Sequence, residues 1–330
     1  MQSMKAVKQV GWGGRANLSV GEAPRPKASK DCVLVRVMAV SIHPGDDHML
    51  TGRPYLIRAA VGHRDIPGMD FAGVVEELGS GVEGFAPGDE VLGTTDTACG
   101  AFAEYVSIPS QYIVKKPGNI AWETAASIAT SGQTALQAMR LGRVVTKDSR
   151  VLINGASGGV GSIAVQLAKQ MGAHVTGVCS TNNVELVRSL GADVVVDYKV
   201  GTVETASAGR KYDKILDMAG RPGCRKLLTP TGDYVAVALP YPESECVPCA
   251  LFTVLCSPCC CCCLSSKKSH AFMQSVEASD LQELTTMVSE GKLRVVVGTR
   301  LEGLEALPDA YAGHGTARVA GKTVVEMHRE

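Results

Sequence analysis

The stretch of the chain with the clearest chemistry is a glycine-spaced turn at residues 155–161. An apolar run at residues 151–153 predicts a strand that enters it, and residues 160–171 carry apolar side chains at helical spacing. A helix N-terminus offers unpaired N–H groups and a positive dipole end, so this turn is typical of a pyrophosphate site. The candidate cofactor-binding residues are Gly155, Ala156, Ser157, Gly158, Gly159, Val160 and Gly161.

A purely structural glycine turn is the alternative, because spaced glycines alone are weak evidence. Here the strand, the turn and the helix are followed by a second apolar run at residues 174–178, which completes a β-α-β unit. We therefore prefer a dinucleotide site of the Rossmann type.

The end of that second run bears on the choice between NAD and NADP. NAD enzymes usually place an acidic side chain there to bind the ribose 2′-hydroxyl. Residues 178–183 read Val-Cys-Ser-Thr-Asn-Asn and contain no acid. Hydroxyl and amide groups can bind a 2′-phosphate without repelling it, so NADPH is favoured. The alternative is that these polar residues only cap the next helix.

The surrounding sequence indicates two domains. Up to about residue 120, short apolar runs such as residues 32–37 and 71–75 alternate with turn residues, which predicts a compact β domain. From residue 150 onward, strands alternate with helices, which indicates a parallel sheet. We expect strands at residues 151–153, 174–178, 194–196, 214–216, 234–237, 293–297 and 322–327, and helices at residues 122–139 and 278–290.

Composition limits the classes of function. The chain has 330 residues with 33 Lys and Arg against 33 Asp and Glu, and only 5% aromatic residues. A neutral chain with few stacking side chains is not expected to bind nucleic acid. The N-terminus resembles neither a signal peptide nor a typical transit peptide, which favours a cytoplasmic location, or an organelle if the chain is a processed or truncated form.

Several motifs, in order, resemble the quinone oxidoreductase branch of the medium-chain dehydrogenase/reductases. They are residues 67–75, 85–91, 155–161, 185–193, 197–198, 212–220 and 321–325. The resemblance covers nearly the whole chain except about residues 243–270. It implies an α/β protein in which a GroES-like β-rich catalytic domain (residues 1–124 and 276–330) flanks a Rossmann domain with a doubly wound parallel sheet (residues 125–275). It also implies a cleft between the domains, and a homodimer.

The resemblance assigns the candidate catalytic residues. His43 stands where the family usually has an Asn near the nicotinamide, and Asp46 matches a family Asp that we interpret as structural. A histidine could donate a hydrogen bond or a proton there, or it could be a tolerated packing substitution. His48 stands where many relatives carry Tyr or another large residue, so it could line the cleft.

The resemblance also assigns further cofactor-binding residues. Thr134 fits a family Thr near the nicotinamide, and Lys322 is assigned to the cofactor site. Ser180 and Tyr198 fit the expected surroundings of a 2′-phosphate, whereas Asn183 replaces a basic residue found in some relatives.

No metal is expected at the site. Zinc-dependent relatives use a Cys and a Gly-His-Glu motif, but this chain has Ser41 at the first position and Met69 and Asp70 at the second. The resemblance therefore implies zinc-free hydride transfer from NADPH to a small quinone or α,β-unsaturated carbonyl. A non-catalytic NADPH-binding sensor or structural protein with the same fold is the alternative, motivated by His43 and His48.

Most of the 12 cysteines lie at residues 246–263. Free Cys behaves as a small hydrophobe, so we prefer an apolar helix or loop. The spacing Cys246-x-x-Cys249 and Cys256-x-x-Cys259 would suit a zinc knuckle, which would make the block an interaction module. Membrane contact through acylation is not expected, since prolines interrupt the run.

Overall fold

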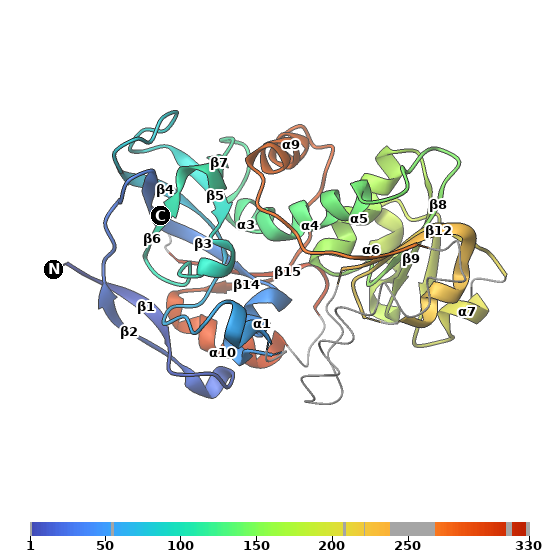
Figure 1. The fold of residues 1–330 in the computed structure, drawn as a ribbon, viewed down its shortest axis with the longest axis horizontal. Helices are drawn as coiled ribbons and strands as arrows, with labels where there is room; N and C mark the ends of the chain where they lie inside the picture. Colours follow the sequence, from blue (N-terminus) through green and yellow to red (C-terminus); the bar gives the residue numbers. More distant parts are fainter. Residues whose placement is uncertain are drawn as a thin grey trace. The chain divides into compact units, whose positions relative to one another are not determined.

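The computed structural model describes residues 2–53, 56–206, 209–220, 222–237, 268–314 and 319–327. Its contacts divide the chain into two compact units (Figure 1). Unit 1 contains Met1–Gln133 and Ser275–Glu330, and unit 2 contains Thr134–Gln274. The protein is of the mixed α/β class, as expected. The predicted domain limits at residues 124/125 and 275/276 stay a prediction, and the cysteine block at residues 246–263 lies outside the described residues.

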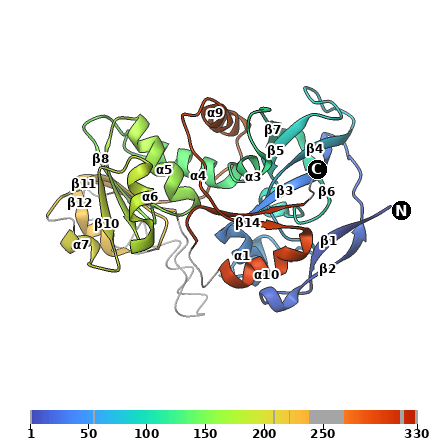
Figure 2. The ribbon, with the colours of Figure 1, turned by 180° about the vertical axis from the view of Figure 1, so that it is seen from behind.

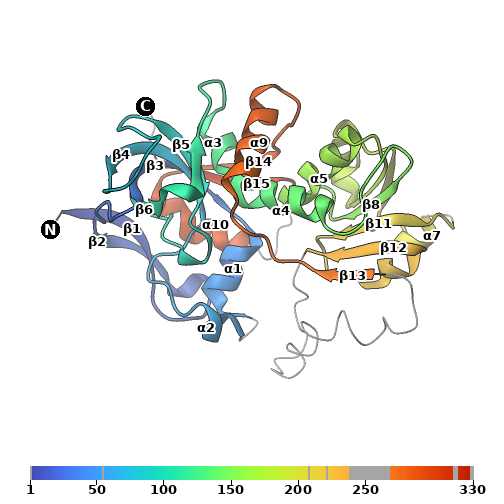
Figure 3. The same cartoon turned by 45° about the horizontal axis from the view of Figure 1, so that its top comes forward.

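Unit 2 is a six-stranded, all-parallel sheet in the order β10-β9-β8-β11-β12-β13. Its strands are β8 (Arg150–Asn154), β9 (His174–Cys179), β10 (Val194–Asp197), β11 (Tyr212–Asp217), β12 (Leu228–Ala236) and β13 (Lys268–Ala271). The five strands expected between residues 151 and 237 are therefore confirmed as β8 to β12, although β12 begins six residues earlier than expected. Figure 3 shows β8, β11, β12 and β13 side by side.

Helices connect the strands from β8 to β11, as parallel pairing requires. Helix α5 (Gly159–Gln170) packs on β8 and β9, and α6 (Val184–Ser189) packs on β9 and β10 (Figure 2). In the sheet, β9 lies on one side of β8 and β11 lies on the other, so the strand order reverses at β8. Parallel α/β sheets bind ligands outside the carboxyl ends of the strands at such a reversal.

Unit 1 is built on a seven-stranded sheet in the order β14-β15-β3-β4-β5-β7, with β6 also paired to β3, and on the hairpin β1-β2. Its strands are β1 (Ser3–Gln9), β2 (Leu18–Pro24), β3 (Cys32–Ile42), β4 (Asp70–Leu78), β5 (Glu90–Thr94), β6 (Tyr105–Pro109), β7 (Ile113–Lys115), β14 (Val297–Glu302) and β15 (Lys322–Glu326). Strand β3 is almost entirely buried because nearly every residue is apolar, which suits a strand covered on both faces.

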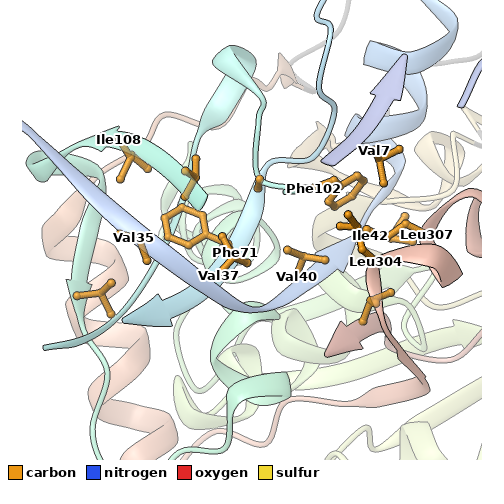
Figure 4. Packing of buried hydrophobic residues seen from close by; sticks show 14 of the residues in the cluster. Val7, Val35, Val37, Val40, Ile42, Phe71, Phe102, Ile108, Leu304 and Leu307 are labelled. Carbon is orange, nitrogen blue, oxygen red and sulfur yellow. The ribbon is translucent and has the colours of Figure 1, made fainter. Parts of the chain in front are cut away.

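The core of unit 1 joins both ends of the chain (Figure 4). Val7 of β1 and Phe102 pack in the same buried cluster as Leu304 and Leu307 from the C-terminal segment. Phe102 also makes an edge contact with the ring of Tyr311, with the ring centroids 5.9 Å apart. This shared core fixes β15 beside β3, which matters for the polar residues described below.

The helices of unit 1 are α1 (Pro44–Thr51), α2 (Leu56–Ala60), α3 (Trp122–Ala126), α9 (Ala278–Ser289) and α10 (Leu307–His314), and α4 (Ala129–Arg140) crosses the boundary to unit 2. The helical stretch expected at residues 122–139 is two helices, because Ser127 N–H bonds to the carbonyl of Thr124 and tightens the last turn of α3. Among the described residues, no helix is long and apolar enough to span a bilayer.

The strand expected at residues 293–297 is wrong. The structure begins β14 at Val297 instead, and its pairing with β15 extends to Glu302. The backbone N–H groups of Lys292 and Leu293 both donate to the carbonyl of Met287 and close the end of α9. The apolar side chain of Leu293 is thus buried at a helix end rather than in a sheet.

Candidate functional site

The glycine turn lies at the carboxyl end of β8, and Gly155, Gly158 and Gly161 are glycine for different physical reasons. Gly155 has φ 88°, a left-handed conformation that favours glycine. A Cβ at Gly161 would lie 2.1 Å from the carbonyl oxygen of Gly155, so only glycine lets α5 pack against the turn.

Gly158 differs from both. Its φ of −77° and ψ of 176° suit any residue, and among the described residues a Cβ there would meet only the Gly155 oxygen at 3.5 Å, an ordinary contact. Neither the backbone nor packing within the described part of the chain requires glycine at this position. The physical reason that remains is close approach of a group from outside the chain.

The turn presents unpaired donors to such a group. The first intrahelical bond of α5 runs from Ser162 N–H to the carbonyl of Gly158, so the N–H groups of Gly159, Val160 and Gly161 have no acceptor within the helix. The N–H groups of Gly155 and Ala156 both donate to the carbonyl of Val178, which connects the turn to β9. The three helix amides, at the positive end of the dipole, can bind an anion.

Polar side chains connect this turn to the end of β9. The Asn183 side-chain amide donates to the Ser157 hydroxyl at 3.1 Å and to the Ser180 hydroxyl at 3.2 Å. The neighbouring thiol of Cys179 is uncharged at neutral pH, because burial raises its pKa to about 11. The structure thus brings Ser157, Ser180 and Asn183 together, and these three side chains place no negative charge there.

Tyr198 follows β10 and lines a cavity of about 400 Å³. Its backbone N–H donates to the carbonyl of Cys179, which holds the ends of β9 and β10 together. Lys199 lines the same cavity, whereas Arg188 forms an ion pair with Glu185 on the surface of α6. Lys199 was not among the expected site residues, although its position directly after Tyr198 is a usable sequence signal.

The two remaining cofactor candidates lie in different units. Thr134 is buried in α4, at the start of unit 2. Lys322 begins β15 in unit 1 and is 3% exposed, with its ammonium nitrogen 3.5 Å from Oδ2 of Asp70. Lys322 therefore belongs to a buried polar cluster of unit 1.

His43 is the N-cap of α1 and is held in one tautomer. The Gly45 N–H donates to Nδ1 of His43 at 3.0 Å, so Nδ1 carries no proton and the ring proton lies on Nε2. Nε2 lies 3.6 Å from Oδ2 of Asp46 and 4.0 Å from Oδ2 of Asp70. Because a Cβ at Gly45 would lie 2.7 Å from the His43 ring, glycine is needed to seat the imidazole.

Asp46 completes the cap by accepting the His43 backbone N–H at 2.9 Å. Burial, reinforced by the charge of Asp70, raises the pKa of Asp46 to about 8, so the side chain is mostly a neutral acid at pH 7. Asp46, which matches a family Asp, therefore carries a protonated carboxyl group at pH 7. The residue type alone did not reveal this.

Asp70 is the anion of this cluster and is surrounded by donors. Its Oδ1 accepts from the backbone N–H and the hydroxyl of Thr130, at 3.2 and 2.5 Å. Its Oδ2 accepts from the Ser41 hydroxyl at 3.4 Å and faces Lys322. Strand register causes this convergence, since β3 places Ser41 opposite Asp70 of β4 on one side and Val324 of β15 on the other.

The side chains of His48 and Met69 make contacts of other kinds. The ring Nδ1 of His48 lies 2.8 Å from the carbonyl oxygen of Arg53, and burial lowers the His48 pKa, so this ring is neutral. Met69 packs with Met49 and Cys99 in an apolar cluster. Within the described part of the chain, no three His, Cys, Asp or Glu side chains are grouped to hold a metal ion.

Comparison with known protein families gives two matches. Residues 29–118 match the alcohol dehydrogenase GroES-like domain, and residues 190–325 match the zinc-binding dehydrogenase family.

Individual relatives span nearly the whole chain. The present chain is 33% identical over 327 residues to the chloroplast envelope quinone oxidoreductase homolog of Arabidopsis thaliana, and the match covers 95% of each chain. It is 34% identical over 333 residues to the trans-enoyl reductase pgmF of Aspergillus terreus, covering 94% and 92%. The solved quinone oxidoreductase of Coxiella burnetii superimposes with a TM-score of 0.87 at 27% identity, covering 99% and 100%.

The contrast between Gly158 and Gly161 gives the first prediction. Gly158→Ala should weaken NADPH binding at least about tenfold, because the added methyl group obstructs a ligand, and should leave unfolding nearly unchanged. Gly161→Ala should instead destabilise the protein by about 1–3 kcal/mol, since its methyl group meets the Gly155 carbonyl. Nucleotide titration and denaturant unfolding measure both, with Gly118→Ala, at an open position, as the control. Unchanged NADPH binding in Gly158→Ala would contradict the assignment.

The raised pKa of Asp46 gives the second prediction. The folded state holds a proton on Asp46 up to about pH 8, whereas the unfolded chain releases it near its ordinary pKa of 3.8. Stability should therefore fall as pH rises through this window and level off above it. Asp46→Asn keeps an acceptor for His43 and should flatten the profile of unfolding free energy between about pH 5 and about pH 9. The exposed Asp148→Asn is the control, and identical slopes in Asp46→Asn and wild type would refute the effect.

Proposed function

Since the chain belongs to the medium-chain dehydrogenase/reductase superfamily and to its quinone oxidoreductase branch, we propose that this oxidoreductase is an NADPH-dependent, zinc-independent reductase of quinones or α,β-unsaturated carbonyls. NADPH supplies the hydride when bound. The observation that carries the proposal is the turn itself, where Gly158 has no internal reason to be glycine and three helix amides face outward.

The residues after β9 and β10 support NADPH over NADH. The Ser157, Ser180 and Asn183 network offers hydroxyl and amide groups to a 2′-phosphate, without the carboxylate that would repel it. Asn183 carries no charge and Arg188 is paired with Glu185, so our candidate for a positive charge at the 2′-phosphate is Lys199, whose ammonium nitrogen lies 5.6 Å from the centre of the Tyr198 ring.

The donor chemistry of Asp70 supports a zinc-free reaction. Its carboxylate already accepts hydrogen bonds from Thr130 and Ser41 and pairs with the ammonium of Lys322. These groups occupy the lone pairs that a zinc ion would need, and the thioether of Met69 is turned into an apolar cluster. The cationic group held beside Asp70 is therefore the ammonium of Lys322.

The geometry of His43 defines what this residue contributes. Because Nδ1 accepts a hydrogen bond from Gly45 N–H, the neutral imidazole carries its proton on Nε2. We propose that this N–H donates a hydrogen bond that stabilises negative charge on the acceptor oxygen after hydride transfer. Asp46, a neutral acid held against the same ring, is the group with a proton to release near neutral pH.

The third prediction is turnover itself. With NADPH, the wild-type protein should oxidise the cofactor only when a quinone such as 1,2-naphthoquinone or an enone is added. The change in nicotinamide fluorescence on titration reports binding, and the loss of that fluorescence after the acceptor is added reports turnover in the same cuvette. Binding without turnover on any acceptor would favour the sensor or structural alternative, and absence of binding to either nucleotide would overturn the cofactor site.

The fourth prediction concerns cofactor choice. Ser180→Asp places a carboxylate at the end of β9, where it should repel the 2′-phosphate and accept a hydrogen bond from a ribose 2′-hydroxyl. The ratio of NADPH to NADH affinity should fall at least about tenfold. Ser189→Asp, on the exposed face of α6, is the matched control. An unchanged ratio in Ser180→Asp would exclude this position from the 2′-phosphate site.

A further inference from the structure

A second buried polar network lies in unit 2, and the function proposed above does not use it. Its centre is the Asp217 carboxylate, which is 1% exposed. Its Oδ1 accepts from the Asn154 side-chain amide at 2.8 Å and from the Ala219 backbone N–H at 2.9 Å, and its Oδ2 accepts from the Tyr234 hydroxyl at 2.5 Å. Each oxygen of this carboxylate therefore has a donor.

The network joins the carboxyl ends of three neighbouring strands. Asn154 ends β8, Asp217 ends β11 and Tyr234 lies near the end of β12, and these strands lie side by side (Figure 3). Main-chain bonds follow the same route, from Met218 N–H to the carbonyl of Asn154 and from Val237 N–H to the carbonyl of Asp217. The strand ends are thus fixed at the edge of the sheet where the glycine turn begins.

Asp217 acts on the turn through the two residues that follow it. A Cβ at Gly155 would lie 3.3 Å from Cβ of Met218 and 3.8 Å from Cβ of Ala219, so these residues form the wall behind Gly155. The bond from Ala219 N–H to Asp217 holds that wall in place. The turn is therefore supported by residues 218–219 and tied to β9 through the carbonyl of Val178.

Stability alone does not explain a buried carboxylate at this place. Removing a carboxylate from water is costly, and apolar side chains of similar volume often stabilise an interior as well or better. Burial and the charge of Asp217 raise the pKa of Tyr234 far above its ordinary value, so its hydroxyl remains a donor at any physiological pH. The directionality of these bonds is what an apolar cluster could not provide.

We propose that Asp217 is a positioning residue for the phosphate-binding turn. Fixed by Asn154 and Tyr234, it holds Met218 and Ala219 behind Gly155 and so sets the affinity of the turn for the dinucleotide without touching it. The inference rests on the proposed function, because it takes the turn to be the dinucleotide site.

A double-mutant cycle on the full-length protein tests this assignment. Asp217→Asn keeps the shape and one acceptor but cannot accept from the Tyr234 hydroxyl, and Tyr234→Phe removes the donor. Each single variant should raise the NADPH dissociation constant about tenfold. The double variant should raise it no further than the larger single effect, because both remove the same interaction. At saturating NADPH, kcat and the acceptor KM should stay at the wild-type values.

Tyr212→Phe is the control, since it removes a hydroxyl from a buried tyrosine at the opposite end of β11. It should leave NADPH affinity unchanged. If the Asp217 and Tyr234 variants lose thermal stability but bind NADPH like wild type, the network only stabilises the sheet and the inference is overturned. If wild type itself binds no nucleotide, the proposed function fails first and the inference fails with it.

Discussion

The contact between Gly161 and the carbonyl of Gly155 is the constraint on which unit 2 depends. It brings α5 so close to the turn that no side chain fits between them. The helix therefore begins directly at the turn, and its first three N–H groups have no acceptor within the helix. The carbonyl of Val178 and the two residues that follow Asp217 contact the turn from the neighbouring strands, which supports the proposed anion site.

Unit 1 meets a different constraint, which is the cost of burying charge. Asp70 and Lys322 are both buried, and they face each other, with hydroxyl and amide donors around the carboxylate offsetting the cost of burial. Burial raises the pKa of Asp46 to about 8, so this carboxyl group avoids the cost by holding a proton. The cluster combines an ion pair, a protonated acid and an imidazole whose Nδ1 accepts a hydrogen bond, which suits the proposed stabilisation of a developing anion.

Local sequence pattern was enough to predict unit 2 in outline. Apolar runs located β8 to β12, and glycine spacing located the turn, because these features depend on neighbouring residues. The clusters were not predictable, because they depend on strand register. Asp70 and Lys322 are 252 residues apart in sequence, and Asp217 looks like any polar residue at a strand end. The prediction of a strand at the apolar run of residues 293–297 was wrong for a related reason, since Leu293 closes a helix instead of entering a sheet.

The proposed function implies direct hydride transfer from the cofactor to the acceptor. The most direct measurement uses NADPH carrying deuterium at both hydrogen positions of C4 of the nicotinamide ring, mixed with the protein and an α,β-unsaturated ketone in ordinary water. We predict that the product carries one deuterium at the β-carbon and a solvent-derived proton at the α-carbon. A reduced product without deuterium at the β-carbon, or no reduced product with any acceptor, would contradict the account.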